Sequence, residues 1–266
     1  MKIPAFLLGV LGLLAAVLAA QQRPQLNDGD AHGDPPFMVE DGWMPLLNGH
    51  GVSGWHARDG KPVGWFTTRY VLWDRLLGPT RLSGSPAPSG EILNGPHGRE
   101  SDLITDRKFG DIELYVEFLI AKGSNSGVFL QSLYEVQIFD SYQSTEPMTS
   151  SDAGGIYHQW VDNNHGVGGS APSRNMCRPP GQWQSFQIWF RAPRFDAAGH
   201  KTENARFLRV LFNGMSVQNN VETAGPTRAH LDIPEAAENP LMLQGDHGPV
   251  AFRNIYWRPL RPIIER

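Results

Sequence analysis

The chain has 266 residues, of which 40% are hydrophobic and 19% are charged, which is the composition of an ordinary globular protein. Its formal net charge of -4 comes without any dense run of Lys or Arg, so the electrostatic pattern of a nucleic-acid-binding protein is missing. A chain disordered throughout and a nucleic-acid partner are therefore both poor interpretations of this sequence.

Residues 1–20 have the pattern of a secretory signal peptide. Lys2 supplies an early positive charge, an apolar run extends from Ile3 to Ala20, and small residues precede a polar stretch. The apolar run lies near the lower length limit of a spanning helix, so a membrane anchor is the alternative. We expect cleavage after Ala20 and an exported protein, periplasmic or extracellular, without stable membrane insertion.

Residues 21–41 are predicted to form a flexible N-terminal arm, because they are polar and rich in turn-forming residues. The folded domain is expected over residues 42–262. Cys177 is the single cysteine of the chain, so no intramolecular disulfide can form. Burial of apolar side chains must therefore stabilise the fold.

Short apolar segments separated by Gly, Pro, Asn and Asp indicate an all-β protein. Residues 111–118 alternate strictly, with Ile112 starting an apolar face and Glu113 belonging to a polar one, which predicts a half-buried antiparallel strand. Asn213-Gly214 between two apolar runs predicts a hairpin with a type I′ turn. Further strands are expected at 127–131, 134–140, 184–190, 240–244 and 250–257.

Many strands without crossover helices predict a sandwich of two antiparallel sheets, or jelly roll. In such a fold, strands near Trp43–Leu47 and Phe252–Trp257 are expected to lie side by side. The turn-rich segment from Leu82 to Glu100 is a long loop of the kind that often shapes a binding site.

The predicted strand 134–140 carries a carboxylate and an amide among its apolar residues. With a period of two, Glu135 and Gln137 share one face, while Val136 and Ile138 share the other. Because the apolar pair belongs in the core, the polar pair is expected to line a groove on the open face. A solvated face with incidental polar residues is the alternative.

Seven segments of the chain form an ordered pattern: PLLNGHGVSGW (45–55), GSNSGVFLQ (123–131), YEVQIFD (134–140), GGIYHQW (154–160), GQWQSFQIWF (181–190), LFNG (211–214) and LMLQGDHGPVAFRNIYWRPL (241–260). Together they resemble the 3-keto-disaccharide hydrolase domain family. The resemblance implies a concanavalin-like jelly roll and the hydrolysis of 3-keto-glycosides. The segment between Trp65 and Leu103 is longer and richer in Pro and Gly than the resemblance leads us to expect.

A sugar oxidised to a ketone at carbon 3 has an acidified hydrogen at carbon 2, so its glycosidic bond can break by elimination, followed by addition of water. This chemistry needs an acid or base that titrates near neutral pH and donors for the enolate oxygen. Glu135 is the leading candidate acid or base, His247 is a second, and Arg253 is either a donor to the enolate or a structural ion-pair residue. The candidate substrate-binding residues are Gln137, Gln244, Asn125, Tyr157 and His158, of which His158 has a structural role as its alternative.

A divalent metal ion held by Glu135 with His247 or His158 is one option, although no local H-x-H or H-E-x-x-H spacing supports it and no other cofactor is implied. Two alternatives keep a glycoside or oligosaccharide partner. A laminarinase-like glycoside hydrolase needs two carboxylates close together on one face, and Asp140 has the opposite parity to Glu135. A non-catalytic carbohydrate-binding domain would hold sugar by aromatic stacking and amide contacts.

Overall fold

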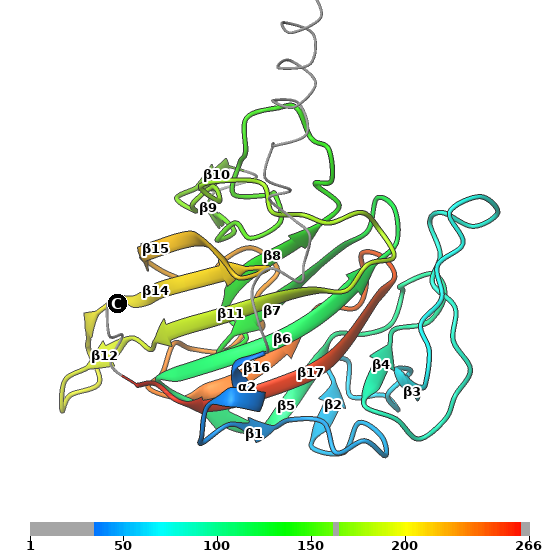
Figure 1. Cartoon of the computed structure of the whole chain (residues 1–266). Helices are drawn as coiled ribbons and strands as arrows, with labels where there is room; N and C mark the ends of the chain where they lie inside the picture. The colour runs from blue at the N-terminus through cyan, green and yellow to red at the C-terminus, as the bar shows by residue number, and fades with distance from the viewer. Residues whose placement is uncertain (1–34, 162–164, 262–266) are drawn as a thin grey trace, which may run out of the picture.

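The computed structural model describes residues 35–161 and 165–261, so the expected signal peptide and most of the expected arm lie outside the described residues. Two antiparallel sheets pack face to face over this part of the chain, which confirms the all-β jelly-roll sandwich (Figure 1). The described residues include one short helix, α2 (Pro36–Val39), and no helix among them has the length and hydropathy of a membrane span.

The larger sheet has eight strands in the order β15-β14-β11-β6-β17-β4-β3, and β1 also pairs with β17. The order places the C-terminal strand in the middle of the sheet, between two strands that precede it by more than a hundred residues. The bounds are β1 (Met44–Pro45), β3 (Phe66–Thr68), β4 (Glu91–Leu93), β6 (Ile112–Ile120), β11 (Gln184–Arg191), β14 (Ala205–Phe212), β15 (Met215–Thr223) and β17 (Val250–Pro259).

The smaller sheet has five strands in the order β2-β5-β16-β7-β8, and two further strand pairs lie at the periphery. The five strands are β2 (Trp55–Ala57), β5 (Leu103–Phe109), β16 (Asn239–Leu243), β7 (Asn125–Leu130) and β8 (Tyr134–Phe139). The peripheral pairs are β9 (Gln159–Val161) with β10 (His165–Val167) and β12 (Arg194–Phe195) with β13 (Lys201–Glu203). The five strands predicted at 127–131, 134–140, 184–190, 240–244 and 250–257 correspond to β7, β8, β11, β16 and β17.

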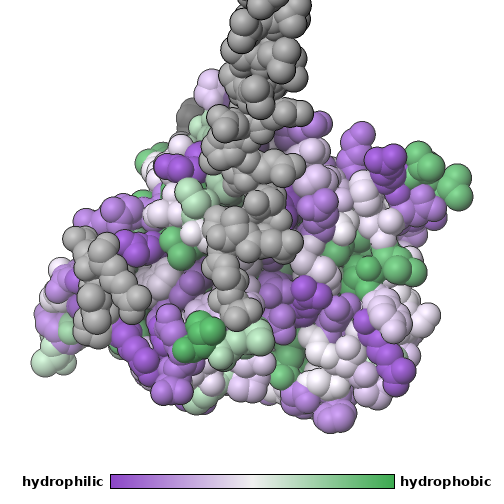
Figure 2. Space-filling model, in the orientation of Figure 1, coloured by the Kyte–Doolittle hydropathy of each residue, from purple (hydrophilic) through white to green (hydrophobic). Residues whose placement is uncertain are grey.

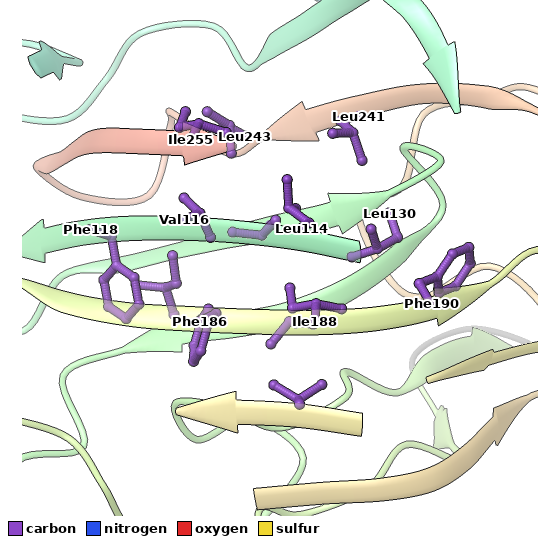
Figure 3. Packing of buried hydrophobic residues seen from close by; sticks show 14 of the residues in the cluster. Leu114, Val116, Phe118, Leu130, Phe186, Ile188, Phe190, Leu241, Leu243 and Ile255 are labelled. Atoms are coloured by element: carbon purple, nitrogen blue, oxygen red, sulfur yellow. The ribbon is translucent and has the colours of Figure 1, made fainter. Parts of the chain in front are cut away.

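The core lies between the two sheets and is built from alternate residues of their strands (Figure 3). From the larger sheet it takes Val116 and Phe118 of β6, and from the smaller sheet it takes Val136 and Ile138 of β8, all of them fully buried. The predicted inward direction of Val136 and Ile138 is therefore confirmed, and Glu135 and Gln137 point to the outer face of the five-stranded sheet.

The hairpin and the meeting of the two ends are both confirmed. Asn213 and Gly214 connect β14 to β15 with φ values of 48° and 79°, the left-handed conformation that a type I′ turn needs. β1 pairs with β17 through Met44 opposite Trp257 and Pro45 opposite Tyr256. This pairing joins the two ends of the domain, as a closed jelly roll requires.

The prediction that residues 111–118 form a half-buried strand is wrong, because both faces of β6 are buried. On the outer face Arg258 donates to Glu113 over 2.6 Å and Arg253 donates to Glu117 over 2.5 Å. Tyr115 is covered on the same face by Phe37, whose ring lies 5.3 Å away. The alternating acidic residues Glu113 and Glu117 thus form buried ion pairs beneath the segment that contains Phe37, and they do not face solvent.

The covering segment is the end of the expected N-terminal arm. The ring of Phe37 in α2 stacks on Tyr256 with 4.0 Å between centroids, and Arg258 bonds Glu40 over 2.6 Å. The part of the arm that the structure describes therefore packs on the eight-stranded sheet, and ordered contacts begin before Gly42.

Candidate functional site

A pocket of about 290 Å³ opens on the outer face of the five-stranded sheet, along β7 and β8. Ligand pockets usually measure roughly 300 to 1,000 Å³, so its size suits a small ligand such as one sugar ring. The structure brings together six of the predicted site residues there, with two that were not predicted. The lining is formed by Asn125, Glu135, Gln137, Tyr157, Arg228, Ala229, Gln244 and His247.

Glu135 is placed in this pocket by the strand pairing of β7 with β8. Its backbone N–H donates to the hydroxyl of Thr227 over 3.1 Å, and its side chain is almost fully buried at 3% exposure. The carboxylate lies over Gly127 of the neighbouring strand, where a Cβ atom would stand only 2.1 Å from Oε1. The missing side chain at Gly127 therefore makes the space that the carboxylate occupies.

The environment of Glu135 favours its protonated form. Burial raises its pKa well above the usual 4.5, and the negative charge of Asp102 raises it further, while the positive charge of Arg228 opposes both effects. A carboxyl group with a raised pKa in a pocket is the usual form of a general acid or base that works near neutral pH.

Two amide side chains in the pocket have carbonyl oxygens without a protein partner. The amide nitrogen of Gln137 donates to the Ser151 carbonyl over 3.2 Å, which leaves its Oε1 buried and without a hydrogen bond. The Oδ1 atom of Asn125 is also buried and unpartnered. Because an orphaned buried acceptor costs about 1–3 kcal/mol, both oxygens are suited to receive hydrogen bonds from a ligand.

Arg228 and Ala229 come from the loop that follows β15. Ala229 has a φ of 66°, a left-handed conformation that is uncommon for a residue with a side chain. Arg58 stabilises this conformation, since it donates to the carbonyl oxygens of Ala229 and His230 over 2.9 Å each. Asp102 orients Arg58 in turn across 3.1 Å. The loop has no periodic pattern, so no signal in the sequence points to either lining residue.

Gln244 and His247 are held by the segment between β4 and β5. Asn94 is fully buried and donates to the carbonyl oxygens of Gly245 and Gly248 over 2.8 and 2.9 Å. The imidazole of His247 bonds the carboxylate of Asp246 and lies 3.4 Å from the Gln244 amide nitrogen. Asn94 lies in the segment 82–100, which was predicted to be one long loop but contains β4, and its two bonds fix the loop that carries Gln244 and His247.

Tyr157 lines the pocket and His158 lies behind it. The backbone N–H of Tyr157 donates to the Glu135 carbonyl over 3.1 Å, and the Tyr157 ring stacks on the His158 ring at 4.3 Å. His158 makes its polar contacts with Ser150 and Trp160 and is not among the residues that line the pocket. These contacts favour the structural alternative for His158.

Arg253 does not lie in this pocket. It belongs to β17 of the other sheet, where it bonds Glu117 over 2.5 Å and lies 3.5 Å from Glu91. Its guanidinium also covers the Trp183 ring at 4.2 Å. The structure thus corrects the assignment of Arg253 to the site and favours the ion-pair alternative. The arginine that lines the pocket is Arg228.

The metal option gains no support from the part of the chain that the structure describes. Glu135 and His247 both line the pocket, yet among the described residues no group of three or more His, Cys, Asp or Glu side chains could hold a metal ion. We therefore derive no step of the chemistry from a metal.

A larger groove of about 770 Å³ lies beside the excursion between β3 and β4, and its lining includes Trp73, Tyr142 and three prolines. Hydrophobic residues gather on this right-hand side of the molecule in Figure 2, and Leu76 and Leu77 of the excursion are 80% and 91% exposed. None of the described residues that line the groove has a buried polar side-chain atom without a hydrogen-bond partner. The smaller pocket is therefore the better candidate for chemistry.

Gly127→Ala should lower activity by about a hundredfold, since the added Cβ must displace the Glu135 carboxylate, and an error of about 1 Å in a reacting group costs this much. Steady-state kinetics on the substrate proposed below would measure the loss. Gly90→Ala is the matched control, because a Cβ at Gly90 meets nothing within 4 Å. A Gly127→Ala enzyme with wild-type activity would show that the position of the carboxylate is unimportant.

The chain is similar to several known proteins. A protein named 3-keto-disaccharide hydrolase from Bacteroides thetaiotaomicron is 32% identical over 91 residues, which span 34% of this chain and 27% of that protein. A solved structure from Parabacteroides distasonis, described as a candidate glycosyl hydrolase, has a TM-score of 0.60 and 27% identity, covering 83% of this chain and 84% of that one. A second such structure from the same organism has a TM-score of 0.54 and 16% identity, covering 86% of this chain and 99% of that one.

A family model matches residues 42–258, which is most of the chain and includes every residue that lines the pocket. By this match, the chain belongs to the family described as the 3-keto-alpha-glucoside-1,2-lyase-like domain.

Proposed function

We propose that this protein is an exported enzyme that cleaves the glycosidic bond of 3-keto-glycosides by elimination followed by hydration. The observation that carries the proposal is the convergence in one pocket of Glu135, whose pKa is raised, with the cation of Arg228 and two unpartnered amide oxygens. The names of the family and of the Bacteroides relative support a 3-keto sugar as the substrate. The signal-peptide pattern of residues 1–20 supports export.

In the proposed reaction, the Glu135 carboxylate takes the proton from carbon 2 of the sugar, and Arg228 donates hydrogen bonds to the oxygen at carbon 3 as that oxygen gains negative charge. The bond between carbon 1 and the leaving oxygen then breaks while a double bond forms between carbons 1 and 2. His247 is the candidate that gives a proton to the leaving oxygen. Water next adds across the double bond, with its hydroxyl on carbon 1 and its hydrogen on carbon 2.

The polar layout of the pocket supports this orientation of the sugar. Arg228 can only donate hydrogen bonds, so it suits a ketone or enolate oxygen, which can only accept them. The free oxygens of Gln137 and Asn125 can only accept, so they suit the remaining sugar hydroxyls. A ketone at carbon 3 is therefore best placed beside Arg228, with hydroxyl groups toward the β7–β8 hairpin.

The laminarinase-like alternative is weaker, because retaining hydrolysis of an unoxidised glycoside requires a second carboxylate at about 5 to 5.5 Å from the first. Of the described residues that line this pocket, Glu135 is the only one with a carboxylate. Asp140 instead accepts a hydrogen bond from the Gly123 backbone over 2.8 Å, away from the lining.

Incubation of the purified protein with a glucoside and with its 3-keto derivative tests the proposal, with release of the aglycone as the readout. We expect release from the 3-keto derivative alone. Release from the unoxidised glucoside would point to ordinary glycoside hydrolysis. Binding without release from either compound would indicate a carbohydrate-binding domain without catalysis.

A further inference from the structure

The guanidinium of Arg228 lies over the aromatic ring of Trp160, next to the pocket. Its Cζ atom is 3.9 Å from the ring centroid of Trp160, well within the range of about 6 Å for a cation–π contact. The backbone N–H of Arg228 also donates to the carbonyl of His158 over 2.9 Å. Both contacts come from the segment that includes β9, so this segment decides where the cation is held.

Trp160 is in turn fixed by His158. The indole N–H donates to Nε2 of His158 over 3.1 Å, and the Nδ1 atom of His158 lies 3.2 Å from the Ser150 hydroxyl. An Nε2 atom that accepts must be unprotonated, so the imidazole is neutral in this arrangement. Burial and the charge of Arg228 lower the pKa of His158, which preserves the acceptor. A Cβ on Gly166 would lie 2.6 Å from the imidazole of His158. The imidazole can therefore pack against the backbone of β10 only because residue 166 has no side chain.

We propose that Trp160 is a positioning residue, which holds the Arg228 guanidinium against the pocket so that it faces Glu135 and the substrate oxygen. This inference rests on the proposed function. In this proposal, His158 orients Trp160 by accepting the hydrogen bond of the indole N–H. It also explains an aromatic ring that remains 37% exposed beside a polar pocket, because one face of that ring covers a cation.

The titration of the Glu135 carboxyl group reports the position of Arg228, because the charge of Arg228 lowers the pKa of Glu135. Arg228 from the loop after β15 favours the ionised carboxylate of Glu135, while Asp102, which directly precedes β5, disfavours it. His247 from the loop after β16 also lines the pocket. If Arg228 moves away, the Glu135 carboxyl should hold its proton to higher pH. A merely structural role for Trp160 would not produce this change.

An alternative role for Trp160 is to stack on the sugar itself, and the kinetic constants distinguish the two. A stacking platform contributes to binding, so its loss should mainly raise KM. A residue that positions Arg228 contributes to the stabilisation of the enolate, so its loss should mainly lower kcat. The first experiment therefore compares Trp160→Leu, which removes the aromatic face, with Trp160→Phe, which keeps that face and removes the indole N–H.

We expect Trp160→Leu to lower kcat by about 3- to 30-fold, the range that one cation–π contact supplies, with KM nearly unchanged. Trp160→Phe should restore most of the rate. Val161→Ala is the matched control on the same strand, and it should leave both constants unchanged. If Trp160→Leu does not fold, as judged by thermal unfolding, Trp160→Gln replaces it at this 37% exposed position, and the proposal requires the same fall in kcat with KM nearly unchanged.

A double-mutant cycle tests whether Trp160 acts through Arg228. In an Arg228→Ala background, Trp160→Leu should have less than about a twofold further effect, because the group that it positions has been removed. An equal loss of rate in both backgrounds would overturn the proposal. A rise in KM with unchanged kcat would do so as well.

Carbon-13 NMR of the Glu135 carboxyl group, with its signal identified by its loss in Glu135→Gln, gives a readout without substrate. The titration should move to higher pH in Trp160→Leu and in Arg228→Ala. An unmoved titration in Trp160→Leu would contradict the positioning role. If the wild-type protein cleaves no 3-keto-glycoside, the proposed function fails, and the titration still reports whether Trp160 positions Arg228.

Discussion

Replacing Glu135 by Gln is expected to lower kcat on a 3-keto-glycoside by about 10²- to 10⁴-fold, which is the usual contribution of one general acid or base. Gln keeps the shape of the side chain over Gly127 and removes the proton that titrates. Steady-state kinetics measure the loss. Glu146→Gln is the matched control, since Glu146 is exposed and should leave the rate unchanged. A fully active Glu135→Gln enzyme would exclude Glu135 as the acid or base.

Glu135→Gln should also be more stable than the wild type, and this difference in the free energy of unfolding should grow as the pH rises. A carboxyl whose pKa is raised by folding binds its proton more tightly in the folded state, so its contribution to stability is lost from about pH 4.5 upward, until the folded pKa is passed. Gln cannot ionise and avoids this loss. Thermal unfolding at pH 5 and pH 8 should show that the advantage of Glu135→Gln over the wild type grows with pH. An advantage that shrinks would contradict the raised pKa.

Replacing Arg258 by Met is expected to lower the free energy of unfolding by about 3–5 kcal/mol, the usual effect of removing one partner from a buried ion pair. Arg258 bonds Glu113 over 2.6 Å, and Glu113 is fully buried, so the substitution leaves a buried carboxylate without its cation. The bond from Arg258 to Glu40 is lost as well. Chemical denaturation measured by tryptophan fluorescence gives the size of the effect.

The control for the Arg258→Met prediction is the double variant Glu113→Gln with Arg258→Met. Gln at position 113 can still accept the hydrogen bond that Gln187 donates to Glu113 over 2.8 Å, and it carries no charge. The double variant should recover most of the lost stability. If it is as unstable as Arg258→Met, the loss comes from the contacts of Arg258 with the N-terminal segment and not from a stranded charge.

The alternation of residues in the sequence was sufficient to predict most of the fold. Val136 and Ile138 face the core as the period of two requires, and the hairpin at Asn213-Gly214 follows from turn geometry alone. The alternation at Glu113 was misleading because a periodic pattern distinguishes two faces of a strand and does not say what covers the polar one. Here a basic strand neighbour and the segment before Gly42 cover it, and both are distant in sequence.

The site was predictable where its residues belong to periodic strands and motifs. Glu135 and Gln137 follow from their parity on β8, and Gln244 and His247 from the closing motif of the family resemblance. Arg228 was not predictable, because its loop has no period and reaches the pocket through contacts with Arg58 and His158. Arg253 was misplaced because a strand residue shows its parity in sequence but not which of two sheets it joins.

The central place of β17 in the larger sheet has a consequence for the order of folding. β17 is the last strand of the described residues, yet it lies between β6 and β4 and also pairs with β1. A nascent chain that has not yet reached Val250 leaves the inner edges of β6 and β4 unpaired, and exposed strand edges of this kind promote aggregation. This sheet therefore cannot close until residues 250–259 are available, and the strand edges of β6 and β4 stay open to wrong partners up to that point.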